Sequence, residues 1–282
     1  LPNTKVSRIV KEGNRISSIV AGSETYTANS YIIATGGVSH PETGSTGDGF
    51  NWLKALGHTV ADPTPAIVPL ATEEAWSHTL AGISVEEMKI TFFVDDVKVF
   101  SKKGRILFTH FGLSGPLILN SAKAVGDLLH EGMVTAHIDL FPQTNHGDLD
   151  KEFLEVFDAN KNKIIKNVFG DIVPTGMSSA LLPLFSMVGP DTKVHSISKE
   201  QRKILVHTLK ALPLTITGLM GLDRAVVADG GIPLSEIDTK TMRSTVLENL
   251  FVTGDLLHIN RPSGGFSLQL CWTTGYVAGS HS

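Results

Sequence analysis

The sequence has a single cysteine, Cys271, which excludes an internal disulfide framework and is typical of a protein kept in a reducing cytoplasm. No apolar run approaches the roughly 20 residues that a membrane-spanning helix needs, and no basic-then-apolar signal sequence opens the chain. An excess of positive charge is also lacking. Because the formal net charge is -4 at pH 7, we expect neither nucleic acid nor an anionic membrane as the main partner.

The chain does have enough apolar sequence for a substantial core. Of its 282 residues, 41% are hydrophobic and 18% are charged, which indicates a folded globular protein of two or three units. The chain begins with Leu1 in place of an initiator methionine and enters strand-like sequence at once. We therefore expect it to be a fragment of a longer protein.

The most informative stretch lies near the end of the chain, at residues 250–269. An apolar strand stops at Gly254-Asp255, a loop follows, and Gly264-Gly265 opens an apolar helix. The strand end exposes a carboxylate, the glycines let backbone N–H groups approach a ligand, and a helix N-terminus favours negative charge. This order predicts a site for an anionic or electron-rich ligand. The N1/O2 edge of a flavin ring is our leading interpretation.

The first part of the chain has the pattern of a compact meander that leads into a buried strand. The expected strands of the meander are residues 5–10, 15–21 and 24–28. An apolar strand over residues 31–34 then ends at Thr35-Gly36-Gly37. The two glycines would let the backbone pass close to a cofactor, but an ordinary strand-to-loop turn explains them equally well.

The glycine-spaced segment at residues 44–49 allows two interpretations. Polar residues between glycines ahead of a helix suggest a phosphate loop, but the Gly-Lys-Ser/Thr of a Walker loop is absent. A capped helix over residues 50–56, with Asp48 as its N-cap, is the better interpretation of the spacing.

The proline-rich segment at residues 62–70 cannot be helical, so we place a domain boundary there. Closely spaced strands follow and predict a small antiparallel sheet or barrel. The expected strands are residues 89–94, 97–100, 105–108 and 133–140, with turns at 95–96 and 102–104 and a helix at 117–129. His110, in the loop before that helix, is either a catalytic acid or base or a structural histidine.

A different pattern fills residues 148–212, where apolar residues recur at helical spacing. Ser198 with Gln201 predicts a helix start, and Pro213 predicts a helix end. The segment contains no metal or nucleophile motif, and its apolar stripe indicates a packed core. Strand character returns at residues 214–218 and 224–227, and a turn is expected at 228–234.

Six short motifs occur in order along nearly the whole chain. They are Ile33-Ala34-Thr35-Gly36-Gly37, Gly44-Ser45-Thr46-Gly47-Asp48-Gly49, Pro65-Ala66-Ile67-Val68-Pro69-Leu70, Phe108-Thr109-His110-Phe111-Gly112-Leu113-Ser114-Gly115-Pro116, Gly230-Gly231-Ile232 and Gly264-Gly265-Phe266. Together they resemble a bacterial family of FAD-containing proteins, the NAD(P)/FAD-dependent oxidoreductases that include aminoacetone oxidase. Each motif is weak alone, but six in the family's order make a specific resemblance.

The resemblance implies an α/β fold with an additional β domain. Its parts would be an incomplete Rossmann-like FAD domain, formed by the meander and the C-terminal strand and helix, an inserted antiparallel β-barrel, and a helical insert. We expect the FAD domain at residues 1–68 and 241–282, the barrel at 69–145 and 213–240, and the helical insert at 146–212.

The resemblance also implies which residues line the cofactor. The expected FAD-binding residues are Ala34, Thr35, Gly36, Gly37, Gly254, Asp255, Asn260, Gly264, Gly265, Phe266, Ser267 and Gln269. Asp255 would contact the ribityl chain, and the helix start at Gly264-Gly265 would face the isoalloxazine ring. His110 is the one candidate for a catalytic residue, and no metal site is expected.

One departure from the family pattern limits this expectation. The family opens with a strand, a Gly-x-Gly-x-x-Gly turn and a helix that hold the FAD pyrophosphate, and this sequence has no such motif. The sequence therefore predicts the flavin-ring half of the site without the pyrophosphate half. The apolar surface left uncovered would favour a homo-oligomer or poor retention of FAD.

Two functional hypotheses follow. The first is an FAD-dependent oxidoreductase in which hydride passes through flavin N5 to or from a small-molecule substrate, with NAD(P) as a candidate electron donor. The alternative is a truncated, cofactor-free folded fragment with no activity of its own. We expect a cytoplasmic protein in either case.

Overall fold

The computed structural model describes residues 1–282 and divides them into two compact units. The first unit contains Leu1–Val68 and Met220–Ser282, and the second contains Pro69–Leu219. The division into three parts expected from the sequence stays a prediction. No helix is long and apolar enough to cross a membrane.

The first unit contains three small sheets and two α-helices. Its strands are β1 (Val6–Glu12), β2 (Arg15–Ala21), β3 (Glu24–Tyr26), β4 (Tyr31–Ile33), β5 (Ala61–Ile67), β12 (Val227–Gly231), β13 (Ile237–Asp238), β14 (Arg243–Ser244) and β15 (Leu250–Val252). Its helices are α1 (Asp48–Leu56) and α8 (Phe266–His281), with single 3-10 turns η1 (Pro41–Thr43), η6 (Leu234–Glu236) and η7 (Gly254–Leu256).

The meander β1-β2-β3 forms as the sequence predicts. Gly13 and Gly22 adopt φ angles of 61° and 62° at its two turns, in the left-handed region that glycine enters without a steric penalty. The side chain of Asn249 joins this meander to the start of β15, because it accepts a hydrogen bond from Ile16 N at 2.8 Å and donates one to Ile16 O at 2.9 Å. A local turn signal and one distant amide therefore hold the meander in place.

The four-stranded sheet has the order β13-β14-β15-β4, and its β4–β15 pair is parallel. Val252 pairs with Ile33 in the last row, so both strands end at the same edge of the sheet. Apolar side chains of α1, including the fully buried Leu53, pack in the same core cluster as these strands. The loops that follow β4 and β15 therefore leave the sheet together.

The proline-rich segment forms β5, an edge strand that pairs only with β12. This pairing corrects two expectations, a strand at residues 224–227 and a turn at 228–234, because β12 spans Val227–Gly231. The reason is a non-local backbone contact. A Cβ at Gly231 would overlap the carbonyl oxygen of Leu256, so the glycine allows close approach there instead of making a turn.

Helix α8 leaves most of its apolar surface uncovered. Only Thr274 and Ala278 are buried. Four large apolar side chains are 57% to 78% exposed, namely Phe266, Leu268, Trp272 and Tyr276. Helices that are apolar on all sides are normally buried, so this exposed surface is unusual for a folded unit.

The second unit consists of a barrel with helices inserted between two of its strands. Its strands are β6 (Leu70–Thr72), β7 (Ser84–Val94), β8 (Val97–Thr109), β9 (Gly112–Ser114), β10 (Val134–Asp139) and β11 (Leu212–Leu219). Its helices are α2 (Ala75–Thr79), α3 (Pro116–Leu119), α4 (Ala122–Leu128), α5 (His146–Ala159), α6 (Ser178–Leu181) and α7 (Lys199–Leu209), with 3-10 turns η2 (Ile165–Asn167), η3 (Phe169–Asp171), η4 (Leu182–Leu184) and η5 (Val194–Ser196).

The barrel has the strand order β10-β11-β6-β9-β8-β7 and closes through the pairing of β7 with β10. The turn expected at residues 102–104 is wrong, because β8 runs unbroken through it. Thr91 pairs with Ser101 and Val85 with Ile106, so β7 pairs with β8 on both sides of the expected turn. Cross-strand pairing, which adjacent residues do not reveal, overrides the local turn signal here.

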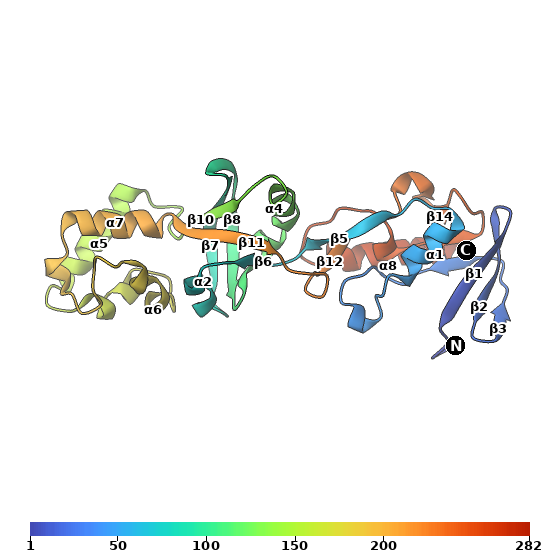
Figure 1. The fold of residues 1–282 in the computed structure, drawn as a ribbon, viewed down its shortest axis with the longest axis horizontal. Helices are drawn as coiled ribbons and strands as arrows, with labels where there is room; N and C mark the ends of the chain where they lie inside the picture. Colours follow the sequence, from blue (N-terminus) through green and yellow to red (C-terminus); the bar gives the residue numbers. More distant parts are fainter. The chain divides into compact units, whose positions relative to one another are not determined.

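The helical insert connects β10 to β11, and in Figure 1 its helices α5 and α7 lie side by side. Helix α7 begins with the predicted cap, in which Ser198 and Gln201 form a reciprocal capping box. Lys210, after α7, donates to Asp139 Oδ2 at 2.9 Å and to the carbonyl oxygen of Phe141 at 2.7 Å. These bonds fasten the end of α7 to the end of β10.

The single helix expected at residues 117–129 is also wrong, because α3 and α4 are separate. Asn120 is the C-cap of α3 and Ser121 precedes α4. The Ser121 hydroxyl donates to the carbonyl oxygen of Leu117 at 2.7 Å. Such side-chain bonds compete with the helical backbone pattern, which accounts for the interruption.

Candidate functional site

The loops that follow the two parallel strands lie in contact. Gly37 follows β4, and Asp255 lies in η7 after β15. A Cβ built on Gly37 would lie 3.4 Å from the Cβ of Asp255, so the two segments approach within van der Waals distance. The structure therefore brings together two of the segments predicted from separate ends of the sequence.

Asp255 connects η7 to the first turn of α8. Its Oδ1 atom accepts a hydrogen bond from Ser267 Oγ at 3.0 Å and another from Arg261 Nη2 at 2.6 Å. The Asp255 side chain is 26% exposed, whereas that of Arg261 is 7% exposed. The carboxylate is thus held from two sides and still reaches the surface.

The start of α8 has no side-chain cap. Its N-cap is Gly265, which has a φ of 90°, and Gly264 before it has a φ of 108°. Apart from its chain neighbours, no heavy atom lies within 4 Å of a Cβ built on Gly265, so there is open space beside this residue at the helix start. The first N–H groups of a helix have no partner within the helix, and here they are available to an anionic or electron-rich group.

Gly254 holds the end of β15 against α8. Its N–H group donates to Thr274 Oγ1 at 3.0 Å, and a Cβ added to it would lie 3.2 Å from Cys271 Sγ. Burial raises the pKa of the Cys271 thiol, and the nearby Asp255 carboxylate raises it further. Cys271 is accordingly a packed thiol with little thiolate character.

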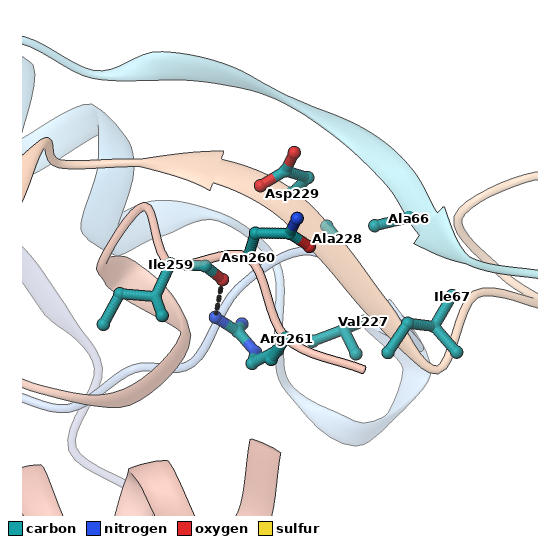
Figure 2. A pocket seen from close by; sticks show the side chains of 8 residues that line it. All are labelled: Ala66, Ile67, Val227, Ala228, Asp229, Ile259, Asn260 and Arg261. Carbon is teal, nitrogen blue, oxygen red and sulfur yellow. Dashed lines mark hydrogen bonds between the residues drawn. The ribbon is translucent and has the colours of Figure 1, made fainter. Parts of the chain in front are cut away.

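A small pocket lies beside this cluster, within the first unit (Figure 2). Its volume is about 10 Å³, room for one water molecule. The lining residues are Ala66, Ile67, Val227, Ala228, Asp229, Ile259, Asn260 and Arg261. Arg261 Nη1 donates to the carbonyl oxygen of Ile259 at 2.7 Å, while Arg261 Nε is buried without a partner. Asp229 Oδ1 lies 3.3 Å from His258 Nε2.

The remaining predicted residues are placed as follows. Ala34 and Thr35 lie in the loop after β4, where the Thr35 side chain packs against Gly49 of α1 so closely that a Cβ on Gly49 would overlap it. A Cβ on Gly36 would lie 3.1 Å from Ser45 Oγ. The predicted N-cap at Asp48 is wrong by one residue, because Gly47 occupies that position with a φ of 82°.

Phe266 and Gln269 lie on the first turns of α8, and both are exposed. The Gln269 side chain donates to Thr273 Oγ1 at 3.1 Å. His110 lies in the second unit, in the turn between β8 and β9. Its ring is exposed and meets the Phe111 ring edge-on, with the centroids 4.9 Å apart. Its catalytic role remains a prediction.

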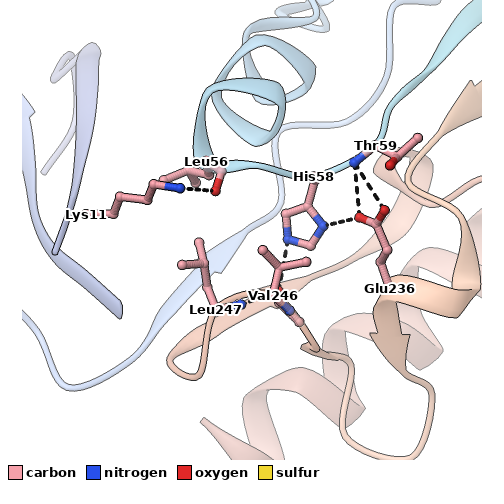
Figure 3. Close-up of polar contacts among 8 residues, drawn as sticks. Lys11, Leu56, His58, Thr59, Glu236, Val246 and Leu247 are labelled. Atoms are coloured by element: carbon pink, nitrogen blue, oxygen red, sulfur yellow. Dashed lines mark hydrogen bonds and ion pairs between the residues drawn. The ribbon is translucent and has the colours of Figure 1, made fainter. Parts of the chain in front are cut away.

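The sequence did not predict a buried network around His58 (Figure 3). His58 Nδ1 lies 2.7 Å from Glu236 Oε2, and His58 Nε2 lies 2.9 Å from Ser244 Oγ. This is the connectivity of a serine hydrolase triad. Here, however, Ser244 is only 5% exposed, and its hydroxyl accepts the N–H groups of Val246 and Leu247. The network is structural, because the oxygen is buried and already hydrogen-bonded.

Three curated proteins that are similar to this chain have names that describe two different reactions. The chain is 27% identical to a 3-dehydro-bile acid delta(4,6)-reductase of Clostridium scindens, over 93% of the chain and 64% of that protein. It is 27% identical to a ribosomal RNA dihydrouridine synthase of Haemophilus influenzae, over 97% of the chain and 65% of that protein. The corresponding Escherichia coli enzyme is 26% identical, over 87% of the chain and 58% of that protein. The chain thus spans less than two thirds of each relative.

The two ribosomal RNA enzymes correct one expectation. The net charge of -4 led us to exclude nucleic acid as a partner, and relatives named for a reaction on RNA contradict that exclusion. Net charge averages over the whole surface, whereas nucleic acids are bound by local basic patches. The overall charge was therefore too coarse a criterion.

The family comparison concerns the middle of the chain. A family model described as the HI0933-like protein barrel and H2TH domain matches residues 64–227. That range contains every strand of the barrel and the helices inserted between β10 and β11. More than half of the chain is matched, and it belongs to the HI0933-like protein family.

Proposed function

We propose that this chain carries the flavin-ring side of the cofactor site of an FAD-dependent oxidoreductase. The observation that carries the proposal is the convergence of residues 34–37, Gly254-Asp255 and the start of α8, with Asp255 bonded to Ser267 at 3.0 Å. In open α/β sheets, ligands bind outside the carboxyl ends of parallel strands. The loops after β4 and β15 leave the sheet at such an edge.

The residues present fit the ring-side part of FAD. The start of α8 has open space around Gly265 and N–H groups without a side-chain cap. Arg261 Nε is buried without a partner, which marks a polar atom available to a ligand or a water molecule. The Asp255 side chain is 26% exposed, which leaves it accessible to a hydroxyl group. These three features favour an electron-rich, hydroxyl-bearing ligand.

Each segment has a distinct proposed role. The N–H groups at the start of α8 would stabilise negative charge on the N1/O2 edge of the ring, and Asp255 would accept a hydrogen bond from a ribityl hydroxyl. Gly36 and Gly37 let the loop after β4 pass close to the ligand. When bound, FAD would supply two-electron hydride chemistry at N5.

The substrate is proposed by chemical class. The relatives are named a delta(4,6)-reductase and a dihydrouridine synthase, and both names describe an unsaturated substrate that gains hydrogen. We propose an enone-like conjugated double bond as the group reduced and a nicotinamide nucleotide as the electron donor. His110 remains the one candidate for a proton donor. The family match does not favour the alternative of a cofactor-free fragment without activity.

The helix start can be tested with glycine variants of this chain. Gly265→Leu fills the space that faces the helix start, so we expect it to weaken FAD binding, measured by flavin fluorescence quenching, by at least about tenfold. Two control variants separate the effect of a bulky side chain from the effect of backbone strain. Gly275→Leu adds the same side chain to an open position on α8, and Gly22→Ala tests a left-handed turn in the meander. Equal affinities in all three variants would refute the assignment of the ring-side segment.

A further inference from the structure

A second candidate site lies in the helical insert, between the start of α5 and the last turns of α7. It is an open pocket with a volume of about 290 Å³. The residues that line it are His146, Gly147, Asp150, Lys203, Val206 and His207. All of them belong to the second unit, so this pocket is independent of the proposed flavin site.

The acidic groups next to the pocket are already neutralised. Asp150 accepts two hydrogen bonds from the Arg202 guanidinium, at 2.6 Å and 3.0 Å. Asp139 accepts the Lys210 ammonium at 2.9 Å. Both cations are 8% exposed, so these are buried ion pairs. Lys203, which also lines the pocket, has no such partner, so the charge that remains is positive.

The two histidines of the pocket form a close pair. The rings of His146 and His207 have centroids 4.6 Å apart, and neither ring makes a hydrogen bond. Burial, the His207 ring and Lys210 hold the pKa of His146 below its ordinary value, against the opposite effect of Asp139. Each imidazole has an N–H group that can donate a hydrogen bond, and the surroundings are positively charged. An anion would accept these hydrogen bonds and balance the charge.

The first turn of α5 adds backbone donors. Asn145 caps this helix, because its side-chain oxygen accepts a hydrogen bond from the N–H of Asp148 at 3.0 Å. The N–H groups of His146 and Gly147 come before Asp148 in the first turn, where helical N–H groups have no partner within the helix. Gly147 has no side chain to cover them. Backbone N–H groups, imidazoles and an ammonium group are the donors typical of phosphate sites in proteins.

We propose that the α5–α7 pocket binds a phosphate group through His146, His207 and Lys203. The group is either a phosphodiester of an RNA backbone or the phosphate of a small molecule, because both present the same oxygens to these donors. Protonated His146 is disfavoured by burial, by the neighbouring His207 ring and by Lys210, and the negative charge of a bound phosphate opposes that effect, so phosphate binding should raise the pKa of His146.

The first experiment follows the His146 ring resonances of the whole chain by NMR as pH is varied. It compares inorganic phosphate, sulfate and chloride at matched ionic strength. We expect phosphate and sulfate to raise the pKa of His146 in a saturable way, while chloride leaves it unchanged. Sulfate keeps its charge over this pH range and so separates titration of the protein from titration of the ligand. The same pKa in all three salts would overturn the proposal.

Matched variants locate the effect. Lys203→Met and His207→Gln remove exposed donors and should each weaken phosphate binding by roughly fivefold, the magnitude expected for an exposed charged contact. Lys193→Met is the control, since Lys193 is an exposed lysine of the same unit that does not line the pocket. If the control weakens binding as much as the pocket variants do, binding reflects general charge and the proposal is wrong.

The second experiment identifies the source of the phosphate. Fluorescence anisotropy with a labelled RNA hairpin measures binding to each variant over a range of salt concentrations. An RNA backbone as ligand predicts that Lys203→Met weakens binding and lowers the log–log salt slope by about 0.9, one lost phosphate contact. If Lys203→Met weakens phosphate binding but leaves RNA binding unchanged, the pocket binds a small phosphorylated molecule. If Lys203→Met changes neither phosphate binding nor RNA binding, the proposed site is wrong.

Discussion

Replacing Ser244 with alanine tests how the buried network around His58 holds the first unit together. The Ser244 hydroxyl accepts the N–H groups of Val246 at 3.0 Å and Leu247 at 2.9 Å, and it bonds His58 Nε2 at 2.9 Å. Leu247 is 1% exposed, so water cannot replace the lost acceptor there without a rearrangement. One substitution therefore leaves several buried polar groups unpaired.

The expected cost follows from the number of groups affected. A buried donor or acceptor that loses its partner costs about 1–3 kcal/mol, and such effects are not additive within one network. We expect Ser244→Ala to lower the free energy of unfolding by about 3 kcal/mol. That is a large part of the roughly 5–15 kcal/mol that stabilises a typical domain.

Urea unfolding followed by circular dichroism measures this loss. Ser7→Ala is the matched control, because the Ser7 hydroxyl makes one exposed bond, to the carbonyl oxygen of Val20 at 3.1 Å. Its effect should stay within about 0.5 kcal/mol. If Ser244→Ala is as mild as the control, the network does not stabilise the unit in the way that we describe.

The same network gives a pH dependence through Glu236. Burial by itself would raise the pKa of Glu236, but hydrogen bonds from Thr59 and His58 outweigh it and hold the pKa below its ordinary value of 4.5. A lowered pKa in the folded state contributes stability that is present above 4.5 and is lost as pH falls through the folded value. Glu236→Gln should therefore flatten the acid side of the stability profile.

Three further predictions concern other parts of the chain. Asp150→Ala leaves the Arg202 guanidinium, 8% exposed, without its partner and should destabilise the second unit by about 3 kcal/mol in urea unfolding; a loss below about 1 kcal/mol would mean that solvent replaces the pair. Gly112→Ala places a Cβ against the β6 backbone and should prevent folding of the barrel, which would be seen as a loss of the circular dichroism signal. Gly82→Ala is the control, because its Cβ would have nothing within 4 Å and should cost only about 1 kcal/mol of backbone strain. Equal effects of the two substitutions would contradict the close approach of Gly112 to β6. Cys271 should react with iodoacetamide more slowly than free cysteine at pH 8, because burial and then Asp255 raise its pKa, and a faster reaction would show that the thiol is not packed.

Local signals predicted the elements that depend on local chemistry. The meander turns follow from Gly13 and Gly22, and the start of α7 follows from Ser198 and Gln201, because turns and caps are formed by neighbouring residues. Non-local contacts account for the errors. The continuity of β8 depends on its pairing with β7, and the backbone of Gly231 depends on close approach to η7.

The candidate site was foreseen in part for the same reason. The strand, glycine turn and helix start of residues 250–269 predicted that Asp255 lies near the start of α8, and Ser267 bonds to Asp255 in the structure. That these residues bind FAD stays a prediction. Arg261 belongs to no motif, so its bond to Asp255 was not foreseen. The partners of His58 lie 178 and 186 residues away in the chain, and no spacing rule connects them.

Hydrogen exchange of this chain with and without excess FAD, followed by mass spectrometry, tests the proposed flavin site most directly. Amides buried by a ligand exchange more slowly, so we expect excess FAD to protect residues 34–37 and 254–269. Strand β11 of the barrel should exchange at the same rate in both samples. Protection confined to other segments, or none in either predicted segment, would contradict the account.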